Sequence, residues 1–291
     1  MRFLRKLINH KLTLGTAVLL CSAMLTACSM GGGFNYDRDS AKEGEHKELF
    51  KVSKADANVE FGDDAVVIDL DECSKQALIE EPGDYIVTGK LYGSLVVDAE
   101  DGNVRILLRD ADISASSGPA LYVASAGKVI LTLAEDSDNV LSDSTNYDDY
   151  EGKKACIFSE TDLTINGSGS LSVYSYVGDG IRTAETLKIV GGDLYVLAKK
   201  NALRGNDGVL VTPDRLQIEC EGYGIVTITD SKGRSGDVQI NGGDISITSG
   251  KQPVLSRGDL YISLPADVKI YSVLPGFEVD GELYVEEGAV E

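Results

Sequence analysis

The chain has 291 residues, of which 43% are hydrophobic, and carries a net charge of −20 at pH 7. Such a negative charge excludes nucleic acid and anionic lipid headgroups as favourable partners, because their phosphates would be repelled. The five cysteines show no paired Cys-x-x-Cys spacing, which argues against a disulfide framework or a zinc site.

The first 27 residues have the features of a bacterial lipoprotein signal peptide. Four basic residues precede an apolar run over residues 12–25, which is too short to span a bilayer permanently. The run ends in Leu25-Thr26-Ala27-Cys28, which resembles a lipobox. We therefore expect cleavage before Cys28, lipidation of Cys28, and a protein anchored to the cell membrane on the side away from the cytoplasm. An ordinary secretory signal with a chance cysteine is the alternative.

Residues 28–55 predict a flexible tether, because they are rich in glycine and charged residues and contain few large apolar ones. Loss of the four basic signal residues would bring the net charge to about −24. Residues 56–291 are long enough for one large domain. Helical propensity is scarce within it, and only residues 71–81 suggest a short helix that could cap an open end of the fold.

One phrase recurs through most of this domain: two alternating apolar residues, a Gly-rich or Asn-rich bend, two more alternating apolar residues, and a third apolar position after a corner. The second pair follows the first at 7 or 8 residues. Most phrases repeat at 22 to 25 residues, and insertions widen two of the spacings to 29 and 34. The first pairs are Val104/Ile106, Val129/Leu131, Leu163/Ile165, Leu187/Ile189, Val209/Val211, Val238/Ile240 and Leu260/Ile262.

This repeat predicts an all-β fold, namely a right-handed single-stranded parallel β-helix with three short strands per rung and about seven to eight rungs. Alternation over short pieces is typical of strands with one face inside and one outside. An antiparallel sandwich also has many short strands, but it would not require the same three-part phrase to recur.

The largest insertion is a candidate metal-binding loop. Residues 135–151 hold seven carboxylates and no lysine or arginine. Oxygen ligands at this density suit calcium, and Asp148 and Asp149 are the preferred ligands. A solvated acidic loop without a metal explains the composition equally well.

A second candidate site lies at the third corner of the phrase. Placing Ile181 in register with Leu203 would stack Asp179 on Asn201 and Arg182 on Arg204, and Asp207 follows at the same corner. Carboxylate, amide and guanidinium groups on one edge suit a cation or a sugar carboxylate, with Asp179 and Asp207 as metal ligands. Because Asp-Gly is also a favoured bend, structure alone explains Asp179 equally well.

Alternation places Tyr174 and Tyr195 on the outer surface of neighbouring rungs, where a phenol ring offers an apolar face and a polar edge to a sugar. Together with Arg182 and Arg204, they are the candidate carbohydrate-binding residues. Once the signal is removed, the only histidine is His46 in the tether, so the familiar histidine-based catalytic arrangements are missing. A lyase that uses an arginine base remains an alternative, and a structural or adhesive surface protein is another.

Several phrases together resemble a known family. They are Ile86-Val87-Thr88-Gly89, Leu95-Val96-Val97-Asp98, the run from Asp162 to Gly169, Gly178-Asp179-Gly180-Ile181 and Gly191-Gly192. Residues 60–270 thereby resemble the bacterial carbohydrate-binding domain-containing proteins, which are calcium-dependent β-helices of the pectate-lyase-like superfamily.

The resemblance implies a non-catalytic domain that binds polysaccharides such as cellulose and polygalacturonate with the help of calcium, and we expect it to be a monomer. Bound cations would let a strongly acidic protein hold an acidic glycan. Asp179 matches the family's Asp-Gly-Ile corner. The next rung departs from it, because Asn201-Ala202-Leu203 stands where a second Asp-Gly-Ile would be expected.

Overall fold

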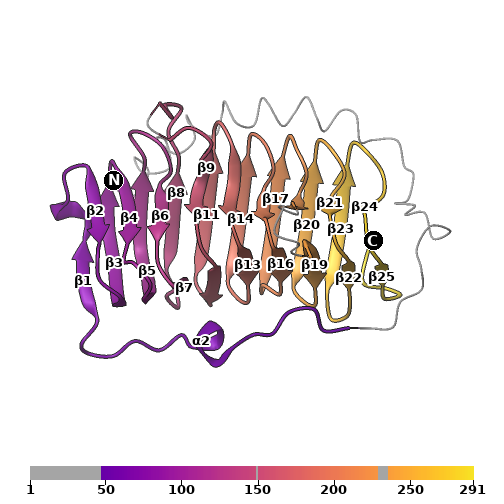
Figure 1. The fold of residues 1–291 in the computed structure, drawn as a ribbon, viewed down its shortest axis with the longest axis horizontal. Coiled ribbons are helices and arrows are strands. Elements are labelled where there is room, and N and C mark those ends of the chain that lie inside the picture. The colour runs from indigo at the N-terminus through magenta and orange to yellow at the C-terminus, as the bar shows by residue number, and fades with distance from the viewer. Residues whose placement is uncertain (1–46, 149, 229–234) are drawn as a thin grey trace, which may run out of the picture. The chain divides into compact units, whose positions relative to one another are not determined.

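The computed structural model describes residues 47–148, 150–228 and 235–291, which are nearly all β-structure (Figure 1). The predicted signal peptide, Cys28, most of the predicted tether and Asp149 lie outside these residues. The helices within the described ranges are α2 (Lys54–Ala57) and the short 3-10 helix η1 (Leu70–Glu72). All described residues belong to a compact unit that spans Tyr36–Glu291.

Among the described residues, no helix has the length and apolar character needed to cross a membrane.

The strands form three parallel stacks. A 16-stranded sheet contains the first and second stacks, which meet at the long strand β5 (Asn103–Ser114), and a 9-stranded sheet forms the third stack. From β10 onward, each coil of the chain adds one strand to each stack in turn. Figure 1 shows successive coils side by side, from indigo at the first strands to yellow at the last.

The first stack contains β1 (Val66–Asp69), β3 (Gly83–Leu91), β5, β7 (Lys128–Leu133), β10 (Leu163–Gly167), β13 (Thr186–Ile189), β16 (Gly208–Val211), β19 (Asp237–Ile240), β22 (Leu260–Ile262) and β25 (Leu283–Val285). The second stack continues from the end of β5 through β8 (Asp138–Ser142), β11 (Ser170–Ser175), β14 (Asp193–Ala198), β17 (Arg215–Cys220), β20 (Asp244–Ser249) and β23 (Asp267–Ser272). The third stack contains β2 (Gln76–Ile79), β4 (Ser94–Asp98), β6 (Leu121–Ser125), β9 (Ala155–Ser159), β12 (Asp179–Thr183), β15 (Leu203–Gly205), β18 (Ile225–Thr227), β21 (Val254–Ser256) and β24 (Glu278–Val279).

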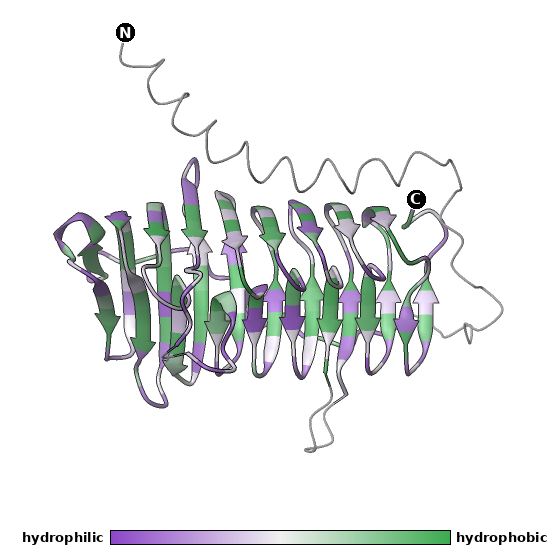
Figure 2. Ribbon diagram, turned by 90° about the horizontal axis from the view of Figure 1, so that it is seen from above, coloured by the Kyte–Doolittle hydropathy of each residue, from purple (hydrophilic) through white to green (hydrophobic). Residues whose placement is uncertain are grey.

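The apolar positions of the sequence repeat form the core as in-register columns. In the first stack Leu163 pairs with Leu187, and Leu187 pairs with Val209. In the third stack Ile181 pairs with Leu203 as predicted, and all of these side chains are completely buried. Figure 2 shows green apolar and purple polar segments alternating along the strands. The pairings between the described strands are parallel, so the antiparallel sandwich is excluded.

Glycines form the bends between the first and second stacks. Gly167, Gly192 and Gly243 occupy equivalent bends and have φ values of 98°, 86° and 95°. Such left-handed backbone is accessible to glycine without the steric penalty that a Cβ atom brings. The Gly-rich bends in the sequence repeat therefore mark real corners.

The prediction of a helix over residues 71–81 is wrong. The 3-10 helix η1 ends at Glu72, and Gln76–Ile79 forms strand β2 of the third stack. Ala77 and Ile79 are buried while their neighbours are exposed, so alternation at period two determines the structure of this segment.

The outer surface of the first stack is covered by residues 47–61, here called the strap. Figure 1 shows this indigo segment running back along the strands, with α2 near its middle. Contacts give its course: Lys47 pairs with Glu282 near the C-terminal coil, and the Arg105 guanidinium lies over the Phe61 ring near the N-terminal coils. The part of the predicted tether from residue 47 to 55 thus lies against the sheet in the described structure.

Asp56 fastens the middle of the strap to the sheet. Its carboxylate is completely buried and forms ion pairs with Lys128 and Lys188, and it accepts a hydrogen bond from the Thr164 hydroxyl at 2.8 Å. Burial raises the pKa of Asp56, but hydrogen bonds from Lys128, Ser53 and Thr164 outweigh it and hold the pKa well below its usual range. Asp56 is therefore charged in the folded protein at neutral pH.

We predict that Asp56→Asn lowers the free energy of unfolding by about 3 kcal/mol at pH 7, because it leaves two nearly buried lysines without their shared carboxylate. The depressed pKa means that the carboxylate contributes stability above its unfolded-state pKa of about 3.9 and loses it as the pH falls further. The difference between wild type and variant should therefore shrink below about pH 4.

Urea unfolding across this pH range measures the effect. Glu60→Gln, which changes an exposed carboxylate of the same strap, is the matched control. Equal stability of Asp56→Asn and Glu60→Gln at pH 7 would contradict the anchoring role of Asp56.

Candidate functional site

The outer surface of the second stack, here called the second-stack face, brings Tyr174 and Tyr195 together. The two rings come from neighbouring strands β11 and β14, with centroids 5.9 Å apart and an interplanar angle of 63°. Both side chains are partly exposed, and the Tyr195 hydroxyl donates a hydrogen bond to Glu219 Oε1 at 3.2 Å. The pair offers apolar ring surface beside a polar edge, as predicted for sugar stacking.

Beside these rings runs a charged column that the sequence analysis missed. The first residues of successive second-stack strands are in register, so Asp193 pairs with Arg215, Arg215 with Asp244, and Asp244 with Asp267. The three carboxylates, here called the aspartate column, are more than half exposed. In the sequence, this column corresponds to a polar residue at the start of the second strand of each coil.

The third-stack face carries the predicted arginine pair. Arg182 and Arg204 are register neighbours on β12 and β15. Arg182 donates a hydrogen bond to Gly152 O at 2.8 Å and lies over the Phe158 ring, 5.0 Å from its centroid. Burial lowers the pKa of Arg204 below its ordinary value, and the nearby positive charge of Arg182 lowers this pKa further. The arginines and the tyrosines therefore lie on different sheets and do not form one site.

An aromatic cluster adjoins Arg182 on the third-stack face. Tyr122 contacts Tyr150 edge to face, at a centroid distance of 5.6 Å, and packs against Phe158 at 6.1 Å. The Lys153 ammonium lies 4.5 Å from the centroid of the Tyr122 ring. Since cations already occupy the exposed ring surface, this cluster is less open to a ligand than the second-stack face.

The corner at Asp179 does not fit a resident calcium ion. Asp179 is buried, and its Oδ1 accepts hydrogen bonds from the Asn201 side chain at 2.8 Å and the Asn201 backbone at 3.2 Å. Its Oδ2 lies 3.7 Å from Arg204 Nη1. The predicted stacking of Asp179 on Asn201 is present. The carboxylate oxygens that would coordinate calcium, however, already interact with the Asn201 amide groups and the Arg204 guanidinium.

The other predicted metal ligands are dispersed among the segments that the structure describes. Asp148 is exposed in the loop between β8 and β9, and Asp207 lies between β15 and β16. Asp149 is outside the described residues. Within the described ranges, no three carboxylate, cysteine or histidine groups converge as a metal site.

Asp143, in the predicted metal loop, serves the fold of that loop. The Ser175 hydroxyl donates to its Oδ2 at 2.7 Å and the Tyr176 amide to its Oδ1 at 2.7 Å, and the Tyr147 hydroxyl lies 2.8 Å from Oδ2. The carboxyl is 4% exposed, and burial raises its pKa more than these hydrogen bonds lower it. Because the Asp143 carboxyl is buried and hydrogen-bonded, it holds the loop against β11. It is not exposed to solvent, where a metal ion could bind it.

Comparison with known proteins finds a match to one protein family. The family model of the carbohydrate-binding domain-containing protein matches residues 74–275. A protein of that description from Acetivibrio thermocellus is 32% identical over 194 residues, which cover 65% of each chain. The match thus spans slightly under two thirds of that relative's length.

A solved structure is also similar. It is described as the polysaccharide lyase-like protein from C. thermocellum in a gadolinium derivative, and it superposes with a TM-score of 0.71 and 30% identity. The superposition covers 78% of the present chain and 98% of the other.

Asp143→Asn should become progressively more stable relative to wild type as the pH rises above about 4, until the pH passes the raised pKa of the folded state. The raised pKa means that the folded protein disfavours the carboxylate, so wild type loses stability once the unfolded chain ionises. An asparagine can accept from the Tyr176 amide and donate to the Ser175 and Tyr147 hydroxyls. Thermal unfolding measured against pH tests this, with Asp148→Asn controlling for the loss of one charge from the same loop. A pH-independent difference would contradict it.

Proposed function

The chain belongs to the carbohydrate-binding domain-containing protein family, and from this we propose that it binds polysaccharide without cleaving it, along the second-stack face. The observation that carries the proposal is the pair of partly exposed rings, Tyr174 and Tyr195, on neighbouring strands of an open sheet surface. Glu219 and Gln217 lie beside them as hydrogen-bonding groups for sugar hydroxyls.

The repetition of the sheet suits a polymeric ligand. Neighbouring strands are about 4.8 Å apart, so every outward position recurs along the stack at that interval. An extended chain of sugars laid across the strands would meet similar groups on each coil. We propose that the three stacks form a right-handed single-stranded parallel β-helix, because parallel crossover connections are right-handed in nearly all proteins. Within the described residues, the nine strands of the third stack exceed the seven to eight rungs predicted from the sequence.

We propose that calcium acts as a bridging ion between the aspartate column and the carboxylates of an acidic glycan. Asp193, Asp244 and Asp267 are exposed and only partly neutralised by Arg215 and Lys269. An acidic glycan would be repelled by this column unless a divalent cation lies between them. A neutral glycan has no such requirement.

We also propose that the protein is a monomer anchored to the membrane by a lipid on Cys28 and displayed outside the cytoplasm. The supporting feature is the basic, apolar and Leu-Thr-Ala-Cys sequence of the first 28 residues. Cys28→Ser should move the protein from the membrane fraction to the soluble fraction.

Tyr195→Ala should weaken binding to cellulose or polygalacturonate about tenfold, since it removes half of the aromatic pair. Tyr122→Ala is the matched control, because Tyr122 is also partly exposed but lies on β6 of the third stack, away from the second-stack face. Pull-down on insoluble glycan measures both, and circular dichroism confirms folding.

The same experiment with EDTA separates the two ligand classes. Retention on polygalacturonate should be lost and retention on cellulose should persist. No binding to either glycan with or without calcium would overturn the proposed function, and unchanged binding by Tyr195→Ala would exclude the second-stack face.

A calcium-dependent polysaccharide lyase is the second candidate, and the lowered pKa of Arg204 beside Arg182 favours it. A partly buried arginine next to a second cation is a better base than a solvated one. Such a lyase would generate unsaturated uronides, whose ultraviolet absorbance should rise with wild type and stay flat with Arg204→Gln. A flat trace with wild type on pectins and alginates would remove this candidate.

A further inference from the structure

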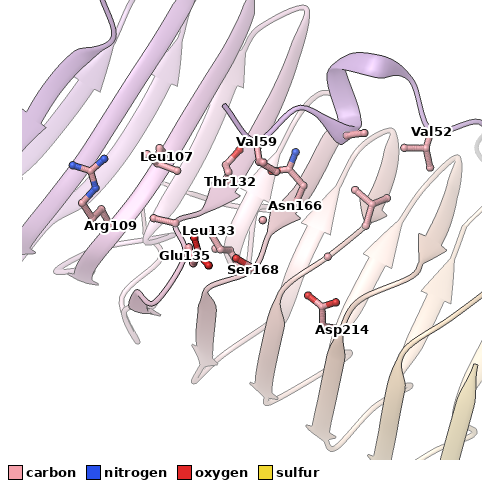
Figure 3. Close-up of a pocket in the computed structure, with 15 residues that line it drawn as sticks. Val52, Val59, Leu107, Arg109, Thr132, Leu133, Glu135, Asn166, Ser168 and Asp214 are labelled. Carbon is pink, nitrogen blue, oxygen red and sulfur yellow. The ribbon is translucent and has the colours of Figure 1, made fainter. Parts of the chain in front are cut away.

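A groove of about 670 Å³ lies between the strap and the outer surface of the first stack (Figure 3). On the strap side it is lined by Val52, Ala57 and Val59. On the sheet side its floor includes Leu107, Thr132 and Asn166. This volume is in the range of ligand-binding sites in proteins, about 300 to 1,000 Å³.

Two polar atoms in the floor of the groove have no hydrogen-bond partner. Thr132 and Asn166 are register neighbours on β7 and β10, and they are 1% and 2% exposed. Asn166 uses its amide nitrogen to hold the strap through the backbone oxygens of Asp56 and Asn58, but its Oδ1 is unpaired, as is Thr132 Oγ1. Buried polar atoms are nearly always satisfied by protein, water or ligand groups, so this unpaired pair marks a place in the groove where a further hydrogen-bonding group would bind.

The chemistry of the lining defines what that ligand would be. Asn166 Oδ1 accepts only, whereas the Thr132 hydroxyl can accept or donate, so the ligand must bring hydrogen-bond donors. The two side chains are about one strand spacing apart, about 4.8 Å, which lets one small ligand reach both. Leu107, Val52 and Val59 supply apolar surface for the carbon framework.

Charge at the rim selects against anions. Exposed Glu135 and Asp214 line the groove, against one exposed cation, Arg109. Carboxylates accept hydrogen bonds from hydroxyl groups but repel a uronate.

We propose that this groove is a second subsite, which binds a neutral sugar unit of the glycan through Thr132 and Asn166. The proposal rests on the proposed polysaccharide binding and deepens it, since it assigns a neutral sugar class to a site separate from the second-stack face. The strap then has a role in binding, because it forms one wall of the subsite.

Thr132→Val tests the subsite, since it removes the unpaired hydroxyl and keeps the shape of the side chain. Titration calorimetry of the full chain with cellohexaose should show affinity weakened about tenfold, the effect of losing one good hydrogen bond. The unfolding temperature should not fall, because the hydroxyl has no partner in the protein. Val59→Trp, which fills the groove from a half-exposed position, should weaken binding as well.

Unchanged cellohexaose affinity in both variants would overturn the subsite and indicate that water alone satisfies these atoms. If Tyr195→Ala then still weakens binding, the proposed function stands without the subsite. An equal loss of affinity for a galacturonate hexamer in Thr132→Val would overturn the assignment to neutral sugars. A wild-type protein that binds neither oligosaccharide would overturn both proposals together.

Discussion

In-register stacking of apolar side chains between parallel coils is the constraint on which the rest of the structure depends. Each coil taken alone has too little apolar surface for a core, and Leu163, Leu187 and Val209 are buried only because each lies on its counterpart in the next coil. Once these columns are fixed, the outward positions are fixed too. Each polar or aromatic residue that faces outward therefore lies one strand spacing from the outward residue at the same register position of the next coil.

The three outer surfaces use this regularity in different ways. The first stack is covered by the strap, and Lys128, Lys188 and Thr164 are outward residues that hold its Asp56. The third stack places cations on aromatic rings, which satisfies both within the protein. The second stack leaves its rings and carboxylates exposed. The second-stack face is therefore the most open of the three surfaces for the proposed binding of a polymer.

The core was predictable from the sequence because period-two alternation and the fixed distance between pairs are local signals. The same logic gave the pairing of Ile181 with Leu203, and with it the neighbours Arg182 and Arg204. The prediction of a helix over residues 71–81 was wrong because the composition of this segment suits a helix. The burial of Ala77 and Ile79 depends instead on the neighbouring coil. The aspartate column was missed because its members are unremarkable one at a time and become a feature only through register.

The strap shows where local composition stops being informative. Residues 47–55 are polar enough to suggest a tether, yet their partners, such as Gln239 and Lys188, lie more than 100 residues away. Phe50 packs against Gly208, where a Cβ atom would meet the ring at 2.5 Å, so even a missing side chain on the sheet contributes to the fit. A polar segment that lies on a sheet needs polar partners on that surface, and Thr164 and Asn166 supply them. Asn166 Oδ1 and Thr132 Oγ1 are among the atoms of that surface that the strap leaves unpaired, and the proposed subsite rests on these two.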